Sequence, residues 1–446
     1  PKAGEYKYTM SVSPLDCMGC GECITVCPVG AIAMVPQESQ ATEQPVFDYL
    51  VANVGKKPGM PADNTVKGSQ FNQPLLEFSG SCAGCAETSY ARLITQLFGE
   101  HMYISNATGC SSIWGGPAAT SPYTVNKDSK KGPAWANSLF EDNAEHGLGM
   151  RIGQQVLRDQ AIASAEKSAS SDQASTEFKA AFAKFMETKD DTRANAEATD
   201  ALVAELEKAA AAGCTGAQAA LDKKDYLAKK SIWIFGGDGW AYDIGFGGLD
   251  HVLASGENVN VMVFDTEMYS NTGGQASKAS NIGEVCQFAA SGKDIGKKSL
   301  AEIAMSYGYV YVAQIALGAN MAQAVKVIAE AEAYNGPSLI IGYAPCELHG
   351  VKGGMNHCQD EMKKAVAAGY WNLFSFNPAL KAEGKNPFTL TSKPGDGTYQ
   401  EFLNNETRYS RLARSFPDRA EKLFAESEQA AKDRYEHLLR LVELYK

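Results

Sequence analysis

The sequence predicts an α/β fold with a doubly wound, mostly parallel sheet, a helical insertion and a small cysteine-rich element in front. Two observations predict the sheet. Strand-like apolar runs alternate with helix-length segments after residue 74 and again after residue 230, and Gly-rich segments follow several of the strands. The third observation is a region rich in Ala, Glu and Lys at about 141–228, which interrupts this rhythm and favours helix.

The predicted domains follow these shifts in composition. An element at 1–36 has too few apolar residues to fold alone, and the polar, proline-rich stretch 37–74 is typical of a linker. The sheet domain is expected at 75–416, followed by a charged amphipathic helix at 417–446. We interpret the insertion, including Cys214, as a solvated helical arm without chemistry.

The expected elements in chain order place the candidate site. The expected strands are Tyr6–Val12, Leu75–Phe78, Met102–Ser105, Ser231–Phe235, Val259–Phe264, Tyr309–Ile315 and Ser338–Tyr343, with a helix start and strand over Val29–Val35. The expected helices are Glu87–Phe98, Ala163–Thr188, Ala194–Ala212, Tyr242–Ala254, Leu300–Tyr307 and Met321–Tyr334. Because ligands of such sheets bind beyond the carboxyl ends of the strands, the Gly-rich segments after Phe235, Asp265 and Tyr343 mark the expected site.

Composition narrows the class of protein. The 446 residues are 44% hydrophobic and 21% charged, with a net charge of -11, which argues against nucleic-acid binding because phosphates repel an acidic surface. No run approaches the roughly 20 apolar residues of a membrane span, and no signal peptide is evident. We expect a soluble, cytoplasmic protein. Its 11 cysteines therefore point to metal ligation or catalysis, since a reducing compartment does not sustain disulfides.

The first candidate site is the spacing Cys-x-x-Cys-x-x-Cys-x-x-x-Cys-Pro, formed by Cys17, Cys20, Cys23, Cys27 and Pro28. In this pattern three thiolates hold one 4Fe-4S cluster and the fourth ligates a second cluster. A zinc site would normally use two ligand pairs or a histidine, and no histidine lies near this run. Both clusters then lack ligands within this sequence. We expect the missing ones upstream, in a longer polypeptide with a two-cluster ferredoxin-like domain.

A second set of thiols lies on loops that could converge at the strand ends. The candidates are Cys82, Cys85, Cys110 and Cys346. Together they could hold a further 4Fe-4S cluster or zinc. Spacing alone favours a small buried core residue for the last two. The remaining thiols Cys286 and Cys358 are interpreted as core or surface residues.

The third candidate site joins two Gly-rich loops at one edge of the sheet. A strand runs into Gly236-Gly237-Asp238-Gly239, and a second strand ends in the loop Asp265–Gly274. Glycines let the backbone approach a diphosphate, and Asp238, the Thr266 hydroxyl and a carbonyl of the second loop could provide oxygen ligands for Mg2+. A dinucleotide fingerprint would need a glycine where Tyr242 stands, and no P-loop motif occurs.

In their order along the chain, these sites resemble the C-terminal portion of the pyruvate:ferredoxin (flavodoxin) oxidoreductases, which are thiamine diphosphate enzymes. The resemblance spans nearly the whole chain. Besides the cysteine run, its motifs are Cys82-Ala83-Gly84-Cys85-Ala86-Glu87-Thr88, Thr108-Gly109-Cys110-Ser111, Gly237-Asp238-Gly239-Trp240, Asp265–Gly274 and Cys346-Glu347-Leu348-His349-Gly350.

The resemblance implies a role for each site residue. The 4Fe-4S cluster nearest the thiamine would be bound by Cys82, Cys85, Cys110 and Cys346. The Mg2+ ligands would be Asp238, Thr266 and the Met268 carbonyl. The residues that contact thiamine diphosphate would be Glu87, Cys110, Gly237, Asp238, Gly239, Trp240 and Asn271. Asn271 would also face the substrate, as the catalytic candidate.

The implied reaction is the reversible oxidative decarboxylation of pyruvate with coenzyme A, giving acetyl-CoA and CO2. Electrons would pass through three 4Fe-4S clusters to ferredoxin or flavodoxin, in a homodimer of the complete, oxygen-sensitive enzyme. In the family, the acid that activates the aminopyrimidine and most groups that grip the substrate carboxylate lie upstream, and none of them is present here. A sister enzyme for 2-oxoglutarate or an aryl pyruvate therefore stays open, as does a subunit that only relays electrons. A non-redox thiamine enzyme would leave the cysteine run unexplained.

Overall fold

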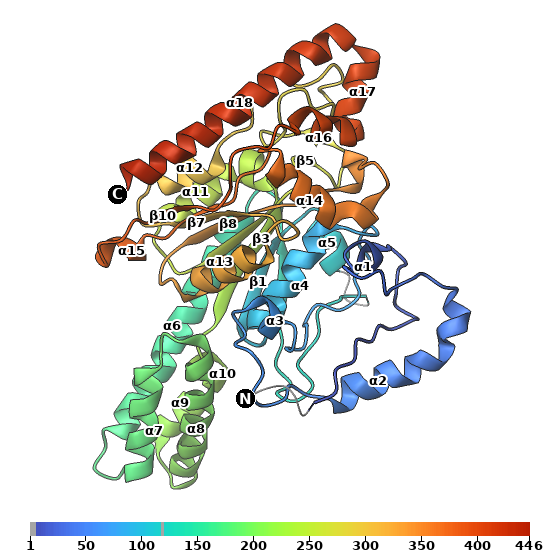
Figure 1. Ribbon diagram of the computed structural model, residues 1–446. Helices are drawn as coiled ribbons and strands as arrows, with labels where there is room; N and C mark the ends of the chain where they lie inside the picture. The colour runs from blue at the N-terminus through green and yellow to red at the C-terminus, as the bar shows by residue number, and fades with distance from the viewer. Residues whose placement is uncertain (1–5, 117–119) are drawn as a thin grey trace.

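The computed structural model describes residues 6–116 and 120–446 and has an eight-stranded sheet at its centre, in the order β10-β9-β7-β8-β4-β3-β1-β2 (Figure 1). The strands are β1 Met102–Ala107, β2 Ala134–Ser138, β3 Ser231–Gly237, β4 Asn260–Asp265, β7 Tyr311–Ile315, β8 Ser338–Tyr343, β9 Phe374–Phe376 and β10 Phe388–Leu390. From β7 to β2 all neighbours are parallel, whereas β9 and β10 pair antiparallel at one edge. A small separate ribbon joins β5 Met268–Tyr269 to β6 Gln275–Ala276. The predicted α/β class and mostly parallel sheet are confirmed.

The central strands form because their sequences are continuous apolar runs, as expected for strands covered on both faces. Every residue of β4 and β8 is buried. Their register aligns Gly237 with Phe264 and Asp265 with Tyr343, and on the other side Asn106 with Phe235. The loops that follow β1, β3, β4 and β8 therefore leave the same edge of the sheet.

Helices cover both faces of the sheet (Figure 1). On one face lie α4 Ala86–Phe98 and α13 Met321–Ala333, and on the other α11 Phe246–Ala254 and α12 Leu300–Met305. The expected helix over Tyr242–Ala254 begins earlier, as a π-helical turn over Gly239–Ile244. The remaining helices of this domain are α5 Cys110–Gly115, α14 Cys358–Ala367, α15 Ala379–Ala382, α16 Tyr399–Asn405, α17 Thr407–Ser415 and α18 Pro417–Leu444. Helix α18 confirms the expected C-terminal helix.

Several short predicted elements are wrong. Among the described residues, Tyr6–Val12 and Val29–Val35 form no strand, because no neighbouring strand pairs with them. The expected strand Leu75–Phe78 is reduced to one isolated bridge between Leu76 and Tyr123. Conversely, β2, β9 and β10 were not predicted, because they are short and carry no long apolar run.

The cysteine-rich element and the following segment contain only short helices. The first is α1 Glu22–Thr25. The stretch expected as a linker includes a 3-10 helix at Gln37–Glu43, α2 Gln44–Asn53 and α3 Val66–Ser69. The hydroxyl of Ser13 donates to the side-chain oxygen of Gln44 at 2.9 Å. This hydrogen bond links the stretch expected as a linker to the cysteine-rich element.

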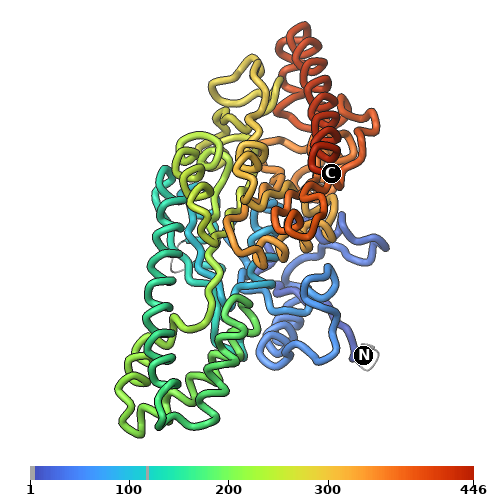
Figure 2. The backbone as a smooth tube through the Cα atoms, turned by 90° about the vertical axis from the view of Figure 1, so that its left-hand side faces the viewer, coloured from blue at the N-terminus to red at the C-terminus, as the bar shows by residue number. Residues whose placement is uncertain are grey.

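The insertion is a bundle of helices that projects away from the sheet (Figures 1 and 2). Its helices are α6 Asn143–Ala169, α7 Thr176–Glu187, α8 Thr192–Ala211, α9 Thr215–Leu221 and α10 Lys224–Leu227. The helix expected over Ala163–Thr188 is interrupted after Ala169, and Ser175 caps the next helix by accepting from the Phe178 amide at 3.1 Å. Phe185, Leu202 and Leu206 are fully buried in a core separate from that of the sheet.

A buried acid joins this arm to the sheet domain and gives a prediction on stability. Glu332 accepts hydrogen bonds from Thr192 of the arm (3.1 Å), from Asn260 (3.0 Å) and from Ser231. Burial raises the pKa of Glu332 above its ordinary value of 4.5. The folded state therefore holds the proton more tightly than the unfolded chain does. The contribution of Glu332 to the stability of the fold is complete below pH 4.5 and declines as the pH rises through the raised pKa.

We expect Glu332→Gln to remove this pH dependence, because the amide is neutral at every pH and of equal size. The free energy of unfolding of the wild type, relative to this variant, should fall as the pH rises above 4.5. Urea unfolding at a series of pH values measures the difference. Two curves that stay parallel over the whole range would contradict the prediction.

None of the helices within 6–116 and 120–446 combines the length and apolar character needed to cross a membrane.

Candidate functional site

Three oxygen atoms from the loops after β3 and β4 meet at the carboxyl edge of the sheet. The Thr266 hydroxyl lies 2.9 Å from Oδ1 of Asp238 and 3.0 Å from the Met268 carbonyl. All three residues are buried, and Asp238 is completely so. Burial, with the nearby charge of Asp265, raises the pKa of Asp238 well above its ordinary value. A carboxyl in such a place is costly to ionise without a cation beside it.

This oxygen group, Asp238, Thr266 and Met268, has the chemistry and spacing of a Mg2+ site. A carboxylate, a hydroxyl and a carbonyl are the hard donors that Mg2+ prefers, and adjacent ligands of an octahedral ion at about 2.0–2.1 Å stand about 2.9 Å apart. Two glycines leave room beside the group. A Cβ on Gly237 would come no nearer than 3.9 Å to its neighbours, and one on Gly109 no nearer than 4.0 Å. The residues present therefore fit a cation together with a diphosphate.

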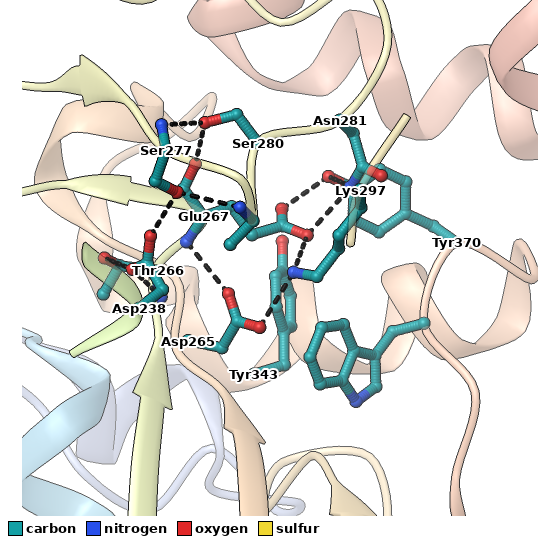
Figure 3. A network of polar contacts seen from close by, with 12 residues as sticks. Asp238, Asp265, Thr266, Glu267, Ser277, Ser280, Asn281, Lys297, Tyr343 and Tyr370 are labelled. Atoms are coloured by element: carbon teal, nitrogen blue, oxygen red, sulfur yellow. Dashed lines mark hydrogen bonds and ion pairs between the residues drawn. The ribbon is translucent and has the colours of Figure 1, made fainter. Parts of the chain in front are cut away.

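Sequence reasoning missed several residues that support the oxygen group. Ser277 donates to Oδ2 of Asp238 at 2.6 Å, and Nε2 of His349 donates to the Thr266 carbonyl at 2.7 Å. Lys297 pairs with Asp265 at 2.8 Å behind the loop (Figure 3). Ser277 and His349 lie in or beside recognised motifs, but nothing in the sequence relates Lys297 to Asp265.

The second set of thiols converges beside the oxygen group. Cys85 is the residue before α4, Cys110 begins α5, Cys346 follows β8, and Cys82 lies on the loop before Cys85. Burial raises the pKa values of the thiols of Cys85, Cys110 and Cys346, the last to about 11, and further increases come from Glu87 and from the other thiols of the set. The four therefore lie close enough to influence one another's charge, although only Cys82 is exposed.

These thiols do not surround a single ion. Within the described part of the chain, no three His, Cys, Asp or Glu side chains are grouped closely enough to hold one metal ion. The thiolates of a 4Fe-4S cluster are attached to different iron atoms of a cube, so they need not share one ion position. The four thiols are therefore compatible with a 4Fe-4S cluster.

The cysteine run lies on the exposed element around α1. Burial raises the pKa of Cys23, and the charges of Cys20 and Cys17 add to the shift. Cys27 differs, because the backbone amides of Ala31 and Val29 lower the pKa of its thiol. Cys17 and Cys20 thus lie close enough to affect the charge of Cys23, while the environment of Cys27 is set by its own loop.

One short segment touches both cysteine loops. Thr25 of α1 donates to the Asn356 carbonyl at 2.5 Å, and a Cβ added to Gly21 would lie 3.5 Å from the Asn356 side chain. On the other side, a Cβ on Gly84 would lie only 2.5 Å from the Met355 carbonyl. Residues 355 and 356 therefore connect the loop at 82–85 with the cysteine run.

The close approach at Gly84 gives a second prediction. Gly84 has φ 76°, a left-handed conformation that costs other residues free energy, and its Cβ position is occupied by Met355. We expect Gly84→Ala to separate the two loops and to lower the melting temperature. The matched control is Gly256→Ala, because Gly256 has φ 73° with nothing within 4 Å of the added Cβ. Thermal unfolding of both variants tests this, and equal losses would contradict a role for the contact.

The other predicted site residues surround the oxygen group in different ways. Glu87 is buried and accepts from the indole of Trp114 at 2.8 Å, and burial raises its pKa to about 7. The Trp240 side chain is buried against Gly236. Gly239 packs against Tyr269, and Asn271 is exposed beyond the oxygen group.

Family comparisons match two parts of the chain. Residues 208–341 match the C-terminal TPP-binding domain of thiamine pyrophosphate enzymes, and residues 10–33 match a 4Fe-4S binding domain. The chain thus has a thiamine diphosphate-binding domain and an iron-sulfur-binding element. The two matches contain the oxygen group and the cysteine run, respectively.

Individual relatives align with almost the whole chain. A pyruvate:ferredoxin oxidoreductase of Moorella thermoacetica is 54% identical over 99% of this chain and 38% of its own length. A pyruvate-flavodoxin oxidoreductase of Klebsiella pneumoniae is 51% identical over 98% of this chain and 37% of its own length. This chain thus spans little more than a third of the length of these relatives.

Among solved structures, a 2-oxoglutarate:ferredoxin oxidoreductase from Magnetococcus marinus aligns with 66% of this chain and 70% of its own. The TM-score is 0.34 at 14% identity, a likeness too weak to support an argument. The sequence relatives, however, share more than half of their aligned residues with this chain. Over the segment that it spans, the chain therefore belongs to the family of pyruvate:ferredoxin (flavodoxin) oxidoreductases.

Proposed function

We propose that this chain is the electron-producing part of an enzyme that oxidises pyruvate with coenzyme A to acetyl-CoA and CO2. Two electrons per pyruvate pass to ferredoxin or flavodoxin, and the reaction is reversible. The names of the close relatives support the substrate and the acceptors. Pyruvate, coenzyme A and the upstream part of the same enzyme are the partners, and a cytoplasmic homodimer follows the family resemblance.

The observation that carries this proposal is Ser270, which joins the oxygen group to the second set of thiols. Its hydroxyl donates to the Thr266 hydroxyl at 2.7 Å, and the same hydroxyl lies near enough to Cys346 to lower the pKa of that thiol, which burial raises. One side chain thus connects a candidate Mg2+ ligand with a candidate cluster ligand. A decarboxylating centre and a one-electron acceptor placed this close suit an oxidative decarboxylation.

The residues of this chain have separate tasks in the proposed site. Bound thiamine diphosphate supplies the electron sink that decarboxylation of a 2-oxoacid needs, and 4Fe-4S clusters accept electrons one at a time. Asp238, Thr266 and the Met268 carbonyl hold the Mg2+ that binds the diphosphate. Gly237 and Gly239 let the backbone approach it, and Asn271, at the exposed end of the loop, contacts the cofactor and faces the substrate.

The proposed clusters number three, and their ligands follow the sequence sets. Cys82, Cys85, Cys110 and Cys346 hold the cluster next to the cofactor. Cys17, Cys20 and Cys23 hold a second cluster, and Cys27 contributes to a third. The ferredoxin-like element at 1–36 and the thiamine domain at 75–416 are then connected by 37–74. The contacts at Asn356 and Met355 support a path between the first two clusters, because they join the two cysteine loops.

Anaerobic assays with the purified holoenzyme test the proposal. Reduction of ferredoxin should require pyruvate, coenzyme A and thiamine diphosphate, and should be faster with pyruvate than with 2-oxoglutarate or an aryl pyruvate. Equal rates with the three acids would reject the pyruvate assignment. Reduction that needs no 2-oxoacid, given an external donor, would indicate an electron relay instead.

A further inference from the structure

The residue between the two loop ligands of the oxygen group has an unusual backbone. Glu267 has φ 62°, in the left-handed region that residues other than glycine rarely adopt. It stands between Thr266 and Met268, and its amide donates to Oδ1 of Asp265 at 3.1 Å. Such a conformation persists where surrounding contacts determine it, and these contacts are found on the side chain of Glu267.

The carboxylate of Glu267 is completely buried and held by four partners. Oε1 accepts from Asn281 at 2.9 Å and pairs with Lys297 at 3.0 Å. Oε2 accepts from the Tyr370 hydroxyl at 2.5 Å and pairs with Arg408 at 2.9 Å. A carboxylate with opposite charges and hydrogen-bond donors on both oxygens is satisfied in the interior.

These contacts hold the backbone at Glu267 in one orientation. In Figure 3, Glu267 lies between the oxygen group on one side and Tyr370 and Asn281 on the other. With the carboxylate anchored in the interior, the left-handed backbone lets the Thr266 hydroxyl and the Met268 carbonyl face the same point, 3.0 Å apart. An ordinary negative φ at this residue would turn one of these two oxygens away from the other.

We propose that Glu267 is a positioning residue for the divalent cation of the proposed function, and that Tyr370 sets its orientation. Glu267 itself does not touch the cation. It preorganises two of the cation's oxygen ligands, so the binding of the metal does not have to arrange them. Loss of its anchors should therefore weaken binding of the cation more than it disturbs the fold.

Two buried tyrosines provide a matched pair of variants. The Tyr370 hydroxyl contacts Glu267 and also Asn281, Tyr409 and Arg408. The Tyr399 hydroxyl contacts Ser427 at 2.8 Å and makes no hydrogen bond with the loop. Both rings are buried, and their centroids are 6.0 Å apart. Tyr370→Phe and Tyr399→Phe each remove one hydroxyl from the same region. Only Tyr370→Phe should change the cation site.

The test is Mn2+ binding to the holoenzyme in the presence of thiamine diphosphate, followed by the electron paramagnetic resonance of free Mn2+, since Mn2+ accepts the same oxygen donors. We expect Tyr370→Phe to weaken Mn2+ binding by about 10-fold and Tyr399→Phe to leave it unchanged. Glu267→Gln, which keeps the size but loses both ion pairs, should weaken it further. The melting temperature without cofactor should fall in both tyrosine variants, and further in Tyr370→Phe, because its hydroxyl has four polar partners and that of Tyr399 has one.

The other possible outcomes reject either the positioning role of Glu267 or the cation site itself. If Tyr370→Phe binds Mn2+ as tightly as the wild type, or if both tyrosine variants lose affinity equally, the positioning role is rejected. Should Glu267→Gln fail to fold, the tyrosine pair still decides the question. A wild-type holoenzyme whose Mn2+ binding does not depend on thiamine diphosphate would instead overturn the cation site of the proposed function.

Discussion

Replacement of Asp238 by asparagine is expected to abolish tight binding of thiamine diphosphate with Mg2+ while leaving the fold intact. Without cofactor, burial and the charge of Asp265 raise the pKa of Asp238, so a negative charge is unfavourable at this position. Asparagine is neutral and of similar size. Its carbonyl can still accept from the Thr266 amide and hydroxyl, and its amide can donate to the Ser277 hydroxyl. Only the negative charge needed by the cation is lost.

The expected size of this effect follows from the role of the residue. Loss of an outer-shell partner typically weakens metal binding by about 10–100-fold, so loss of a charged ligand should cost at least about 100-fold. Calorimetric titration with thiamine diphosphate in the presence of Mg2+ measures it. The control is Asp250→Asn on α11, which also loses a negative charge but keeps an oxygen that can accept from the Tyr307 hydroxyl. Unchanged cofactor affinity in Asp238→Asn would remove the residue from the site.

The parts of the fold predicted from sequence are those with strong local signals. Strands β3, β4 and β8 are continuous apolar runs, and helices α4 and α13 have the expected lengths and positions. The short edge strands β9 and β10 were missed because three residues hold too little periodicity to be recognised, and antiparallel pairing at an edge depends on neighbours far along the chain. The first of the two long helices expected in the arm is divided between α6 and α7 by a serine-rich turn, and the short helices α9 and α10 lie beyond the expected ranges.

The candidate site, like the fold, contains residues that were predictable from the sequence and residues that were not. The oxygen group was predictable because Asp238 and Thr266 end apolar strands within Gly-rich motifs, and parallel strands bring such ends together. The residues that support the oxygen group were not predictable. They include Lys297, Tyr370 and Arg408, which come from three distant parts of the chain and belong to no motif. The left-handed conformation of Glu267 was equally hidden, because glutamate gives no sequence signal for a positive φ.

Replacement of Cys346 by serine is expected to remove one whole 4Fe-4S cluster from the holoenzyme. Burial raises the pKa of the Cys346 thiol to about 11, so without a cluster the group is a neutral thiol that a hydroxyl can replace at little cost in stability. A cluster, in contrast, needs the thiolate, and serine is a poor substitute for this soft ligand. Iron and acid-labile sulfide should each fall by about four per chain, from about twelve for three clusters.

Cys358 provides the control for this prediction. It is fully buried, and burial likewise raises the pKa of its thiol, but the sequence motifs give it no role as a ligand. Cys358→Ser should therefore keep its full iron content. Equal loss of iron in both variants would mean that buried thiols stabilise the domain in general. Loss confined to Cys346→Ser would place the cluster beside Ser270 and the oxygen group, where the short route from cofactor to first electron acceptor requires it.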